Sequence, residues 1–537
     1  MKSFLLALAL IAGQAGLKTN PVLYSDYSDP DVIAVGGEYW MTASSFNMVP
    51  GLQILHSHDL VNWEIVDAAL PAGSPYWKDA VSSPDYGNGV WAPAIRHHDG
   101  RFWIFWGDPD RGIFQVSATD PRGEWTEPVL VLEGRGLIDP CPLWDEDGSV
   151  WLVHGWAGSR AGFKSVLSIC RLSEDCTRCT SEQMMVYDGR SQGCPTIEGP
   201  KIYRRNGWYY IFAPAGGVKT GWQMVLRSRS ITGPYEGKVV MHQGAGEVCG
   251  PHQGGWITDS EGQDWFLHFE DRYAWGRTVH LQPMEWLSDG WCIIGHDMDG
   301  DGIGEPVSGV PEAGTVPEGT GALETGTGFK GESIPLNWQW RADPATGWAM
   351  TCPAQGCLRL NCMASEGTNL RDIPNILSEK IVGPQMSFTC RMVFRPSYAG
   401  DRAGIVIDGL DYATIEMIYD GNTVALEQRI CTEADRGTAE SIAAFTSVAA
   451  DRKAVAPDGE GEIDDSYTAY LKVSIRAEGS GSGIKALCSF SYSLDGKKYR
   501  PLGGEFAARE GKWIGARLGL FATASVARNA GGSVEIY

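Results

Sequence analysis

The sequence lacks a long apolar run beyond its first sixteen residues. No later stretch reaches the roughly 20 apolar residues that a membrane-spanning helix needs. Positive charge is also scarce, since 44 Lys and Arg residues stand against 66 Asp and Glu residues, for a formal net charge of -22. Nucleic acids and anionic membrane surfaces repel such a chain. The composition therefore argues against nucleic acid and membrane partners and favours a neutral substrate.

Cysteine pairs with metal-ligand spacing are almost absent. The chain has 13 cysteines, and its single Cys-x-x-Cys pair, Cys176 and Cys179, has neither a second pair nor a nearby histidine. A zinc site is therefore not expected there. An odd number leaves at least one thiol unpaired in the monomer. We expect most cysteines to be buried as small hydrophobic residues, and one or two disulfides remain open.

The N-terminus is the one short apolar stretch. Lys2 precedes an apolar run over residues 3–12, and the small residues Gly13 to Gly16 follow. This pattern is typical of a secretory signal, with cleavage after Ala15. We expect residues 1–16 to be a signal peptide and the mature protein to be secreted or periplasmic. A buried N-terminal strand or short helix is the alternative.

Helical periodicity is essentially missing, whereas glycine (68 residues) and tryptophan (21 residues) are abundant. Five times a glycine is followed three residues later by an aromatic residue that opens a β-rich run, at roughly fifty-residue intervals. The five glycines are Gly37, Gly100, Gly148, Gly207 and Gly262. Short strands with regular turns exclude a helical solenoid and predict an all-β five-bladed β-propeller.

The repeat stops near residue 306, which predicts a boundary. We expect the propeller to occupy residues 17–306 and a linker rich in Gly, Pro, Glu and Thr to occupy residues 307–327. Residues 328–537 again contain strand-like runs, for example residues 403–407 and 467–475. Their length and strand count predict a β-sandwich of the jelly-roll, concanavalin-like kind.

Residues whose side chains could take part in catalysis recur at nearly the same place in each repeat. Eight to ten residues before each turn glycine stand Asp29, Trp91, Asp139, Glu198 and His252. In a propeller the innermost strands converge on the central axis, so these residues are expected to face one another across a single pit. Converging carboxylates repel, so their pKa values must separate. Glycoside hydrolysis requires such a separation. A turn cap or a surface ion pair is the better explanation of any one acid alone, but not of three acids at matching repeat positions.

The local motifs resemble glycoside hydrolase family 43. They are Ser28-Asp29-Pro30-Asp31, Val90-Trp91-Ala92-Pro93, Ile138-Asp139-Pro140, Ile197-Glu198-Gly199-Pro200, residues 250–255 around His252, and residues 276–283 from Gly276-Arg277. The C-terminal part resembles the concanavalin-like domain of the β-xylosidase and α-L-arabinofuranosidase branches, notably in Trp338-Gln339-Trp340 and residues 401–404. Ile138 stands where some xylosidase branches carry an aromatic residue, which leaves the shape of the sugar pocket open.

The resemblance implies a role for each candidate. Asp29 would be the general base, Glu198 the general acid, and Asp139 would raise the pKa of Glu198 and position it. Inversion would require about 6.5–9.5 Å between the two working carboxyl groups. Arg277 would bind a substrate hydroxyl, and Trp91 and Phe46 would form apolar walls. His252 resembles a histidine that contacts a central calcium through water, with a packed core histidine as the alternative; the chemistry itself would need no cofactor.

The sequence therefore predicts an inverting exo-glycosidase that releases terminal β-D-xylose, α-L-arabinofuranose or both from hemicellulose-derived oligosaccharides. A non-catalytic glycan-binding propeller and an endo-acting arabinanase or xylanase on the same scaffold are the alternatives. A retaining fructan-cleaving propeller enzyme would carry Asn-Asp-Pro-Asn-Gly and Arg-Asp-Pro motifs, which are absent. The expected partner is an oligosaccharide substrate, and the oligomeric state stays open.

Overall fold

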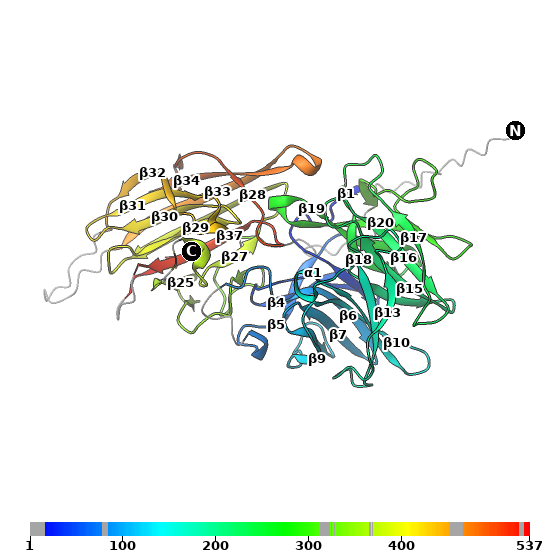
Figure 1. Cartoon of the computed structure of the whole chain (residues 1–537). Coiled ribbons are helices and arrows are strands. Elements are labelled where there is room, and N and C mark those ends of the chain that lie inside the picture. The colour runs from blue at the N-terminus through cyan, green and yellow to red at the C-terminus, as the bar shows by residue number, and fades with distance from the viewer. Residues whose placement is uncertain are drawn as a thin grey trace.

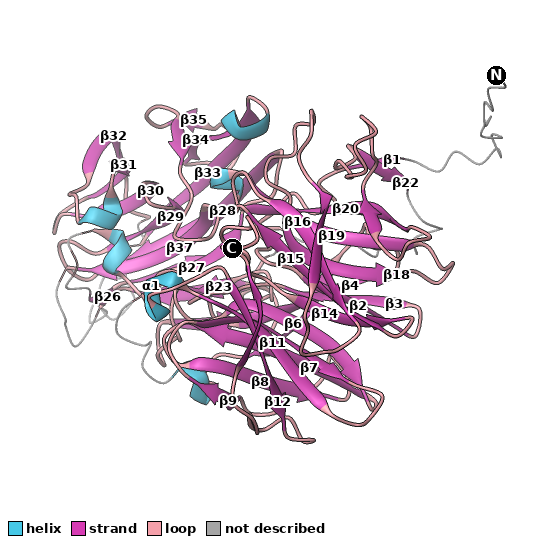
Figure 2. Cartoon of the chain, turned by 45° about the vertical axis from the view of Figure 1, so that its right-hand side comes forward, coloured by secondary structure: helices cyan, strands magenta, loops and turns pink. Residues whose placement is uncertain are grey.

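The computed structural model describes residues 17–77, 84–311, 323, 325–326, 328–364, 367, 369–451, 466–525 and 531–537. The regular secondary structure of the described chain is almost entirely strands, joined by loops and turns (Figure 2). Its N-terminal part, blue to green in Figure 1, forms one lobe, and its C-terminal part, yellow to red, forms the other. The expected all-β architecture, a five-bladed propeller followed by a sandwich, is confirmed.

Each blade of the propeller is a four-stranded antiparallel meander whose strands pair in chain order. Blade 1 comprises β2 (Asp31–Val35), β3 (Glu38–Thr42), β4 (Gly51–Ser57) and β5 (Glu64–Leu70). Blade 2 comprises β6 (Trp91–His98), β7 (Arg101–Asp108), β8 (Gly112–Ala118) and β9 (Val129–Glu133). Blade 3 comprises β10 (Leu137–Trp144), β11 (Val150–Trp156), β12 (Val166–Leu172) and β13 (Met184–Asp188). Blade 4 comprises β14 (Lys201–Arg205), β15 (Trp208–Ala215), β16 (Trp222–Ser228) and β17 (Glu236–Met241). Blade 5 comprises β18 (His252–Thr258), β19 (Asp264–Asp271), β20 (Arg277–Trp286) and β21 (Cys292–Ile294).

The repeated glycines have a backbone reason. Each lies in the turn between the first and second strand of its blade, and all five have φ between 71° and 86°. Only glycine adopts this left-handed region without a steric penalty. The following aromatic residue then lies at or near the start of the second strand, so the sequence repeat and the blade repeat coincide.

Buried charged side chains link the innermost strands of three blades. Arg96 of β6 donates to Oδ2 of Asp31 at 2.5 Å, and the Lys201 ammonium of β14 lies 4.0 Å from the same oxygen. Lys201 also donates to the carbonyl of Pro93 at 2.7 Å. Asp31 and Lys201 are completely buried, so each charge needs its partner. Blades 1, 2 and 4 are thereby fixed relative to one another.

The C-terminal lobe consists of two sheets that pack face to face. The first contains β23 (Gln339–Trp340), β27 (Leu377–Lys380), β37 (Arg517–Ala524), β29 (Arg402–Asp408), β30 (Tyr412–Tyr419), β31 (Val424–Cys431) and β32 (Ser441–Val448), with β26 (Met363–Ala364) beside β37. The second contains β24 (Ala349–Cys352), β25 (Cys357–Asn361), β38 (Ser533–Ile536), β28 (Gln385–Arg395), β33 (Tyr467–Glu478), β34 (Lys485–Ser493) and β35 (Arg500–Pro501), with β36 (Phe506–Ala508) beside β34. Alternating burial along β28 and β33 turns residues such as Leu471, Val473 and Ile475 into the core.

The remaining elements are short. They are α1 (Gly158–Ala161), the 3₁₀ turns η1 (Pro75–Trp77), η2 (Tyr273–Trp275), η3 (Leu370–Asp372), η4 (Ala434–Arg436) and η5 (Gly481–Gly483), and the strand pair β1 (Leu17–Thr19) and β22 (Gly309–Pro311). Within the described ranges no helix has the length and apolar character to cross a membrane. Residues 1–16, assigned above to a signal peptide, lie outside the described residues, as does most of the expected linker.

The two lobes share one hydrophobic core. Trp338 and Trp340 of the sandwich belong to the same buried cluster as Val49 and Leu52 of blade 1. Backbone hydrogen bonds reinforce the contact, since Trp340 donates to the carbonyl of Val49 at 2.6 Å and accepts from its N–H at 2.9 Å. The sandwich is therefore firmly seated on the propeller.

All thirteen cysteines are free, and ten of them are buried. This agrees with the expected role of most cysteines as small core residues. The one or two disulfides that the sequence left open do not form in the structure.

Candidate active site

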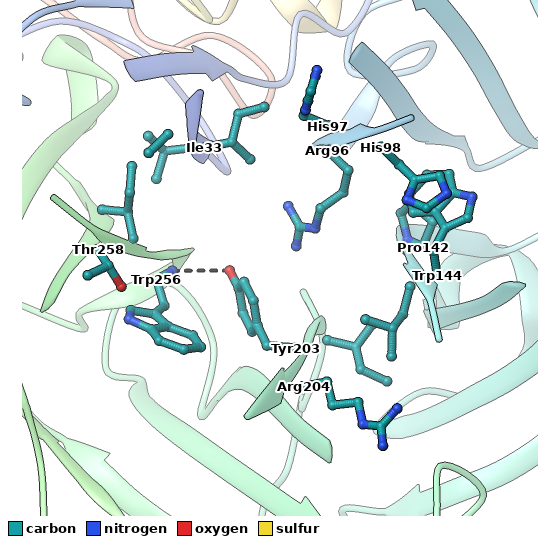
Figure 3. Close-up of a pocket in the computed structure, with 15 residues that line it drawn as sticks. Ile33, Arg96, His97, His98, Pro142, Trp144, Tyr203, Arg204, Trp256 and Thr258 are labelled. Carbon is teal, nitrogen blue, oxygen red and sulfur yellow. Dashed lines mark hydrogen bonds between the residues drawn. The ribbon is translucent and has the colours of Figure 1, made fainter. Parts of the chain in front are cut away.

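Two cavities lie on the innermost strands, and only one contains carboxylates. The larger, of about 540 Å³, is lined by residues further along the first strand of every blade, among them Ile33, Arg96, Trp144, Tyr203 and Trp256 (Figure 3). None of its lining residues is an acid, and Arg96 is paired with Asp31. The reaction expected from the sequence uses a pair of carboxyl groups, and the histidines His97 and His98 of this cavity do not replace them, so this cavity is not the candidate despite its size.

The smaller cavity, of about 120 Å³, lies where the same strands begin. It is lined by Asp29, Phe46, Trp91, Ala92, Ile138, Asp139, Glu198, Val218, Gln253, Arg277 and Trp513. The structure therefore brings six of the seven candidate residues into one pocket. The seventh, His252, lies directly behind Glu198, with its Nε2 atom 3.7 Å from Oε1 of Glu198.

A left-handed residue marks the start of each innermost strand. Asp29, Ala92, Asp139, Gly199 and Gln253 have φ of 53°, 30°, 56°, 58° and 33°, and the first four precede a proline. Non-glycine residues rarely adopt this conformation, and such strain concentrates at functional sites. The five candidates therefore occupy nearly the same place in successive blades, within one residue of the left-handed position. Asp29 and Asp139 hold the left-handed position, whereas Trp91, Glu198 and His252 precede it, because spacing from the turn glycine varies between blades.

Asp29 is held in a fixed orientation by two side chains. Nη1 of Arg277 donates to both of its oxygens, at 3.0 and 3.2 Å, and the Ser44 hydroxyl donates to Oδ2 at 2.6 Å. Both Asp29 and Arg277 are buried to more than nine-tenths. A paired and hydrogen-bonded carboxylate of this kind can accept a proton from a water molecule in the pocket.

Glu198 has the opposite electrostatic setting. Burial, followed by the negative charges of Asp139 and Asp29, raises its pKa to about 8. Burial and the charge of Asp29 also raise the pKa of Asp139, while the Gly199 N–H, which donates to Oδ2 of Asp139 at 2.8 Å, opposes that shift. Glu198 therefore keeps its proton to a higher pH than an ordinary glutamic acid does. Glu198 is thus suited to donate a proton, whereas Asp29 forms an ion pair with Arg277.

His252 is a buried neutral imidazole. Burial, followed by the charges of Arg277 and His268, lowers its pKa to about 3, so its contact with Glu198 is not an ion pair. Neither ring nitrogen has a hydrogen-bond partner among the described residues. Two orphaned buried nitrogens leave a place for an ordered water molecule.

Three aromatic side chains enclose the pocket. Trp91 meets Phe46 edge-to-face at 6.4 Å and Trp513 edge-to-face at 6.3 Å. Trp513 belongs to the sandwich, and its carbonyl accepts from the Ser28 hydroxyl at 3.4 Å, next to Asp29. Gly515 lies two residues after Trp513. A Cβ atom at this position would lie 2.7 Å from the backbone nitrogen of Gly276, so there is no room for a larger residue. The second lobe thus supplies one wall of the pocket.

This arrangement coincides with a known family model. The model described as "Glycosyl hydrolases family 43" matches residues 18–292, about half of the chain. The chain belongs to glycosyl hydrolase family 43. A second model, "Beta xylosidase C-terminal Concanavalin A-like domain", matches residues 327–535, and family 43 membership makes the protein a glycosidase.

Relatives in family 43 align over most of the chain. A protein of Xylanibacter ruminicola named "Putative beta-xylosidase" is 34% identical over 92% of this chain and 85% of its own length. The "Non-reducing end alpha-L-arabinofuranosidase" of Bacteroides ovatus is 26% identical over 76% of this chain and 77% of its own. The solved xylan beta-1,4-xylosidase from Bacillus halodurans shares the fold, with a TM-score of 0.78, 21% identity, and coverage of 96% and 98% of the two chains.

Several residues of this family 43 site were not anticipated from the sequence. Gln253 lies inside the motif over residues 250–255 and Ser44 lies two positions before Phe46, but the sequence assigned neither of them a role. A Cβ atom at Gly199 would lie 2.5 Å from Cδ of Gln253, so the glycine is needed where Gln253 crosses the pocket floor. Trp513 had no local signal, because it lies in another domain.

The electrostatics of this family 43 pocket predict a pH effect. Asp139→Asn removes a negative charge that raises the pKa of Glu198, so that pKa should fall. Glu198 donates a proton only below its pKa, and therefore the alkaline limb of kcat/KM should move to lower pH. The measurement is kcat/KM against pH for wild type and variant. An unmoved or more alkaline limb would show that Asp139 does not set the proton affinity of Glu198.

Proposed function

We propose that this protein is an exo-acting glycosidase that releases a terminal pentose, β-D-xylose or α-L-arabinofuranose, with inversion. The observation that carries the proposal is a pocket of about 120 Å³ with three carboxyl groups on its wall. Pockets for drug-sized ligands measure about 300–1,000 Å³, so this one suits a single sugar ring rather than a chain. The names of the relatives, xylosidases and an arabinofuranosidase, support a pentose from hemicellulose-derived oligosaccharides.

In the proposed mechanism Glu198 acts first as the general acid. It keeps its proton to a higher pH than an ordinary glutamic acid does, and it donates that proton to the glycosidic oxygen as the bond to the anomeric carbon breaks. Asp139 keeps that proton on Glu198 through its charge. The leaving alcohol departs neutral, and Glu198 is left as a carboxylate.

Asp29 completes the same step as the general base. A water molecule on the opposite face of the sugar loses a proton to Asp29 and forms a bond to the anomeric carbon. Arg277 and Ser44 hold the carboxylate toward that water. Attack opposite to the leaving group inverts the anomeric centre, and the product sugar is released from the pocket.

The test uses 4-nitrophenyl β-D-xylopyranoside, 4-nitrophenyl α-L-arabinofuranoside and xylobiose with the wild-type protein, and follows the released anomer by NMR. We expect hydrolysis of at least one glycoside with inversion. Comparable rates on polymeric xylan and xylobiose would favour an endo-acting enzyme. Absence of turnover by a folded protein would favour the non-catalytic glycan-binding alternative.

Trp513 is expected to bind the substrate from the sandwich side. Trp513→Ala removes an aromatic wall that is 44% exposed, so folding should be unaffected. The lost contact amounts to about 1–2 kcal/mol, a 5- to 30-fold fall in kcat/KM for xylobiose, mostly through KM. Phe445→Ala is the matched control, since Phe445 is an exposed aromatic residue of the same lobe outside the pocket. Equal kinetics for the two variants would remove Trp513 from the site.

We also propose that the protein is exported from the cytoplasm. Intact-mass analysis of the protein from its native host should show cleavage after Ala15 if the protein is secreted or periplasmic.

We also propose a structural calcium ion near the propeller centre. The orphaned nitrogens of His252 fit a water molecule that would link the propeller centre to a calcium ion. A fall in Tm on EGTA treatment, reversed by Ca²⁺, would support that ion, and an unchanged Tm would contradict it.

A further inference from the structure

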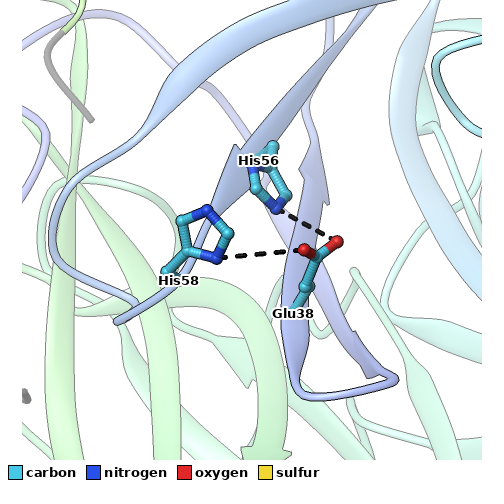
Figure 4. A group of neighbouring side chains, drawn as sticks. All are labelled: Glu38, His56 and His58. Carbon is cyan, nitrogen blue, oxygen red and sulfur yellow. Dashed lines mark ion pairs between the residues drawn. The ribbon is translucent and has the colours of Figure 1, made fainter. Parts of the chain in front are cut away.

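A cluster of potential metal ligands lies on the β3–β4 hairpin of blade 1, away from the pocket. In this hairpin Trp40 pairs with His56 and Tyr39 with Ser57. Residues two apart on a strand share a face, so Glu38 lies on the face of Trp40, and His58 on that of His56. The Trp40 and His56 rings are 4.6 Å apart, which confirms that the two faces are the same. Figure 4 shows His56 and His58 turned toward the Glu38 carboxylate.

The three side chains lie close to metal-ligand distances. Nε2 of His56 is 3.4 Å from one oxygen of Glu38, and Nδ1 of His58 is 3.9 Å from the other. One ligand atom from each residue lies within 4.8 Å of the others. Bonds to Zn²⁺ of about 2.0–2.2 Å place tetrahedral ligands about 3.4 Å apart, so small side-chain rotations suffice.

The burial and hydrogen bonding of His56 are independent evidence for a metal site. Its side chain is 1% exposed, and its Nε2 atom has no hydrogen-bond partner among the described residues. Its other nitrogen, Nδ1, lies 3.1 Å from Oε1 of Glu64. A proton on Nδ1 that is donated to Glu64 leaves the lone pair of Nε2 directed at the cluster. Metal-bound histidines are oriented by a carboxylate in this way.

We propose that Glu38, His56 and His58 bind one divalent first-row transition metal ion, with Zn²⁺ as the preferred probe. Two imidazoles and one carboxylate suit zinc, whereas Ca²⁺ and Mg²⁺ favour oxygen ligands alone. Glu38 and His58 are more than one-third exposed, which gives the ion an entry path and leaves the fourth position to water. The two nearby carboxylates, Glu38 and Glu64, compensate the ion's charge.

One cation competes for the same carboxylate. Nη2 of Arg122 lies 3.8 Å from Glu38, beyond hydrogen-bond distance, and its guanidinium stacks over Trp40 at 4.5 Å. Arg122 follows β8 of blade 2, and Trp40 packs against Phe102 of β7. All three ligands belong to blade 1, so the ion would brace the β3–β4 hairpin, next to the seam with blade 2. Glu38 follows the turn at the end of β2, whereas Asp29 precedes the start of that strand, so the ion is structural and has no part in hydrolysis.

The experiment titrates Zn²⁺ into protein that has been treated with EDTA and dialysed, by calorimetry. We expect one high-affinity equivalent, with affinity at least tenfold lower in Glu38→Gln and in His58→Ala. Both residues are partly exposed, so these variants should fold. Glu64→Gln should weaken binding about 10- to 100-fold, because it removes the carboxylate that orients His56. His97→Ala, at an exposed histidine of blade 2, is the matched control and should bind as wild type does.

Two further measurements test whether the ion binds at this cluster. Co²⁺ should give visible absorption bands of a four-coordinate site in wild type and lose them in His58→Ala. Zn²⁺ should raise Tm by a few degrees in wild type but not in His58→Ala, and kcat should be unchanged with and without the ion. Excess Ca²⁺ should not displace Zn²⁺. Zinc affinity that is equal in wild type, Glu38→Gln and His58→Ala would overturn the proposal, whatever the outcome of the glycosidase assay.

Discussion

Glu198→Gln is expected to lower kcat/KM for xylobiose by about 10²–10⁴-fold, the usual contribution of a general acid. Glutamine keeps the size of the side chain but has no proton to donate to the glycosidic oxygen. The loss should depend on the leaving group. 4-Nitrophenolate departs readily without a proton, so kcat/KM for 4-nitrophenyl β-D-xylopyranoside should fall much less. The measurement is the ratio of the two losses, obtained from initial rates at one pH.

The pH profile of the same variant is a second readout. Because the pKa of Glu198 is raised to about 8, wild-type kcat/KM should decline as pH rises through that value. The decline should be absent from the residual activity of Glu198→Gln. Glu174→Gln, at an exposed glutamate of blade 3, is the control and should behave as wild type. Equal losses on both substrates with the alkaline limb retained would assign the general acid to another group.

The propeller could be predicted from the sequence because its repeat is a local backbone requirement. A turn that demands positive φ selects glycine, and five such turns left five glycines at regular spacing. Convergence of the first strands then follows from propeller geometry alone. The details of register do not follow, because irregular pairings at Ile138/Cys141 and His252/Gly254 shift the strand entries by a residue.

The candidate pocket could be predicted where it is built from the repeat or from the family motifs. Asp29, Trp91, Asp139 and Glu198 come from blade entries, whereas Phe46 and Arg277 were found through the family resemblance. Trp513 reaches the pocket through a contact with Ser28 that spans 485 positions. Packing of two lobes sets that contact, and neither periodicity nor a motif encodes it. The paired roles of Arg277 and Ser44 at Asp29 likewise depend on side-chain geometry that a sequence does not specify.

Asp29→Asn is expected to lower kcat/KM by about 10²–10⁴-fold on both xylobiose and 4-nitrophenyl β-D-xylopyranoside. Asparagine fills the same space and can still accept from Ser44, but it cannot take a proton from water. Both substrates need that water equally, so the loss should not depend on the leaving group, in contrast with Glu198→Gln. Asp120→Asn, at an exposed aspartate of blade 2, is the control.

The same residue decides between inversion and retention. A retaining enzyme would use Asp29 as a nucleophile and form a covalent glycosyl intermediate. A 2-deoxy-2-fluoroxyloside with a good leaving group would trap that intermediate and raise the intact mass of the wild-type protein by one fluorosugar. If Asp29 activates water instead, no adduct forms and the released sugar is inverted. An adduct that disappears in Asp29→Asn would therefore replace the general-base role with nucleophilic catalysis, while leaving Glu198 as the acid.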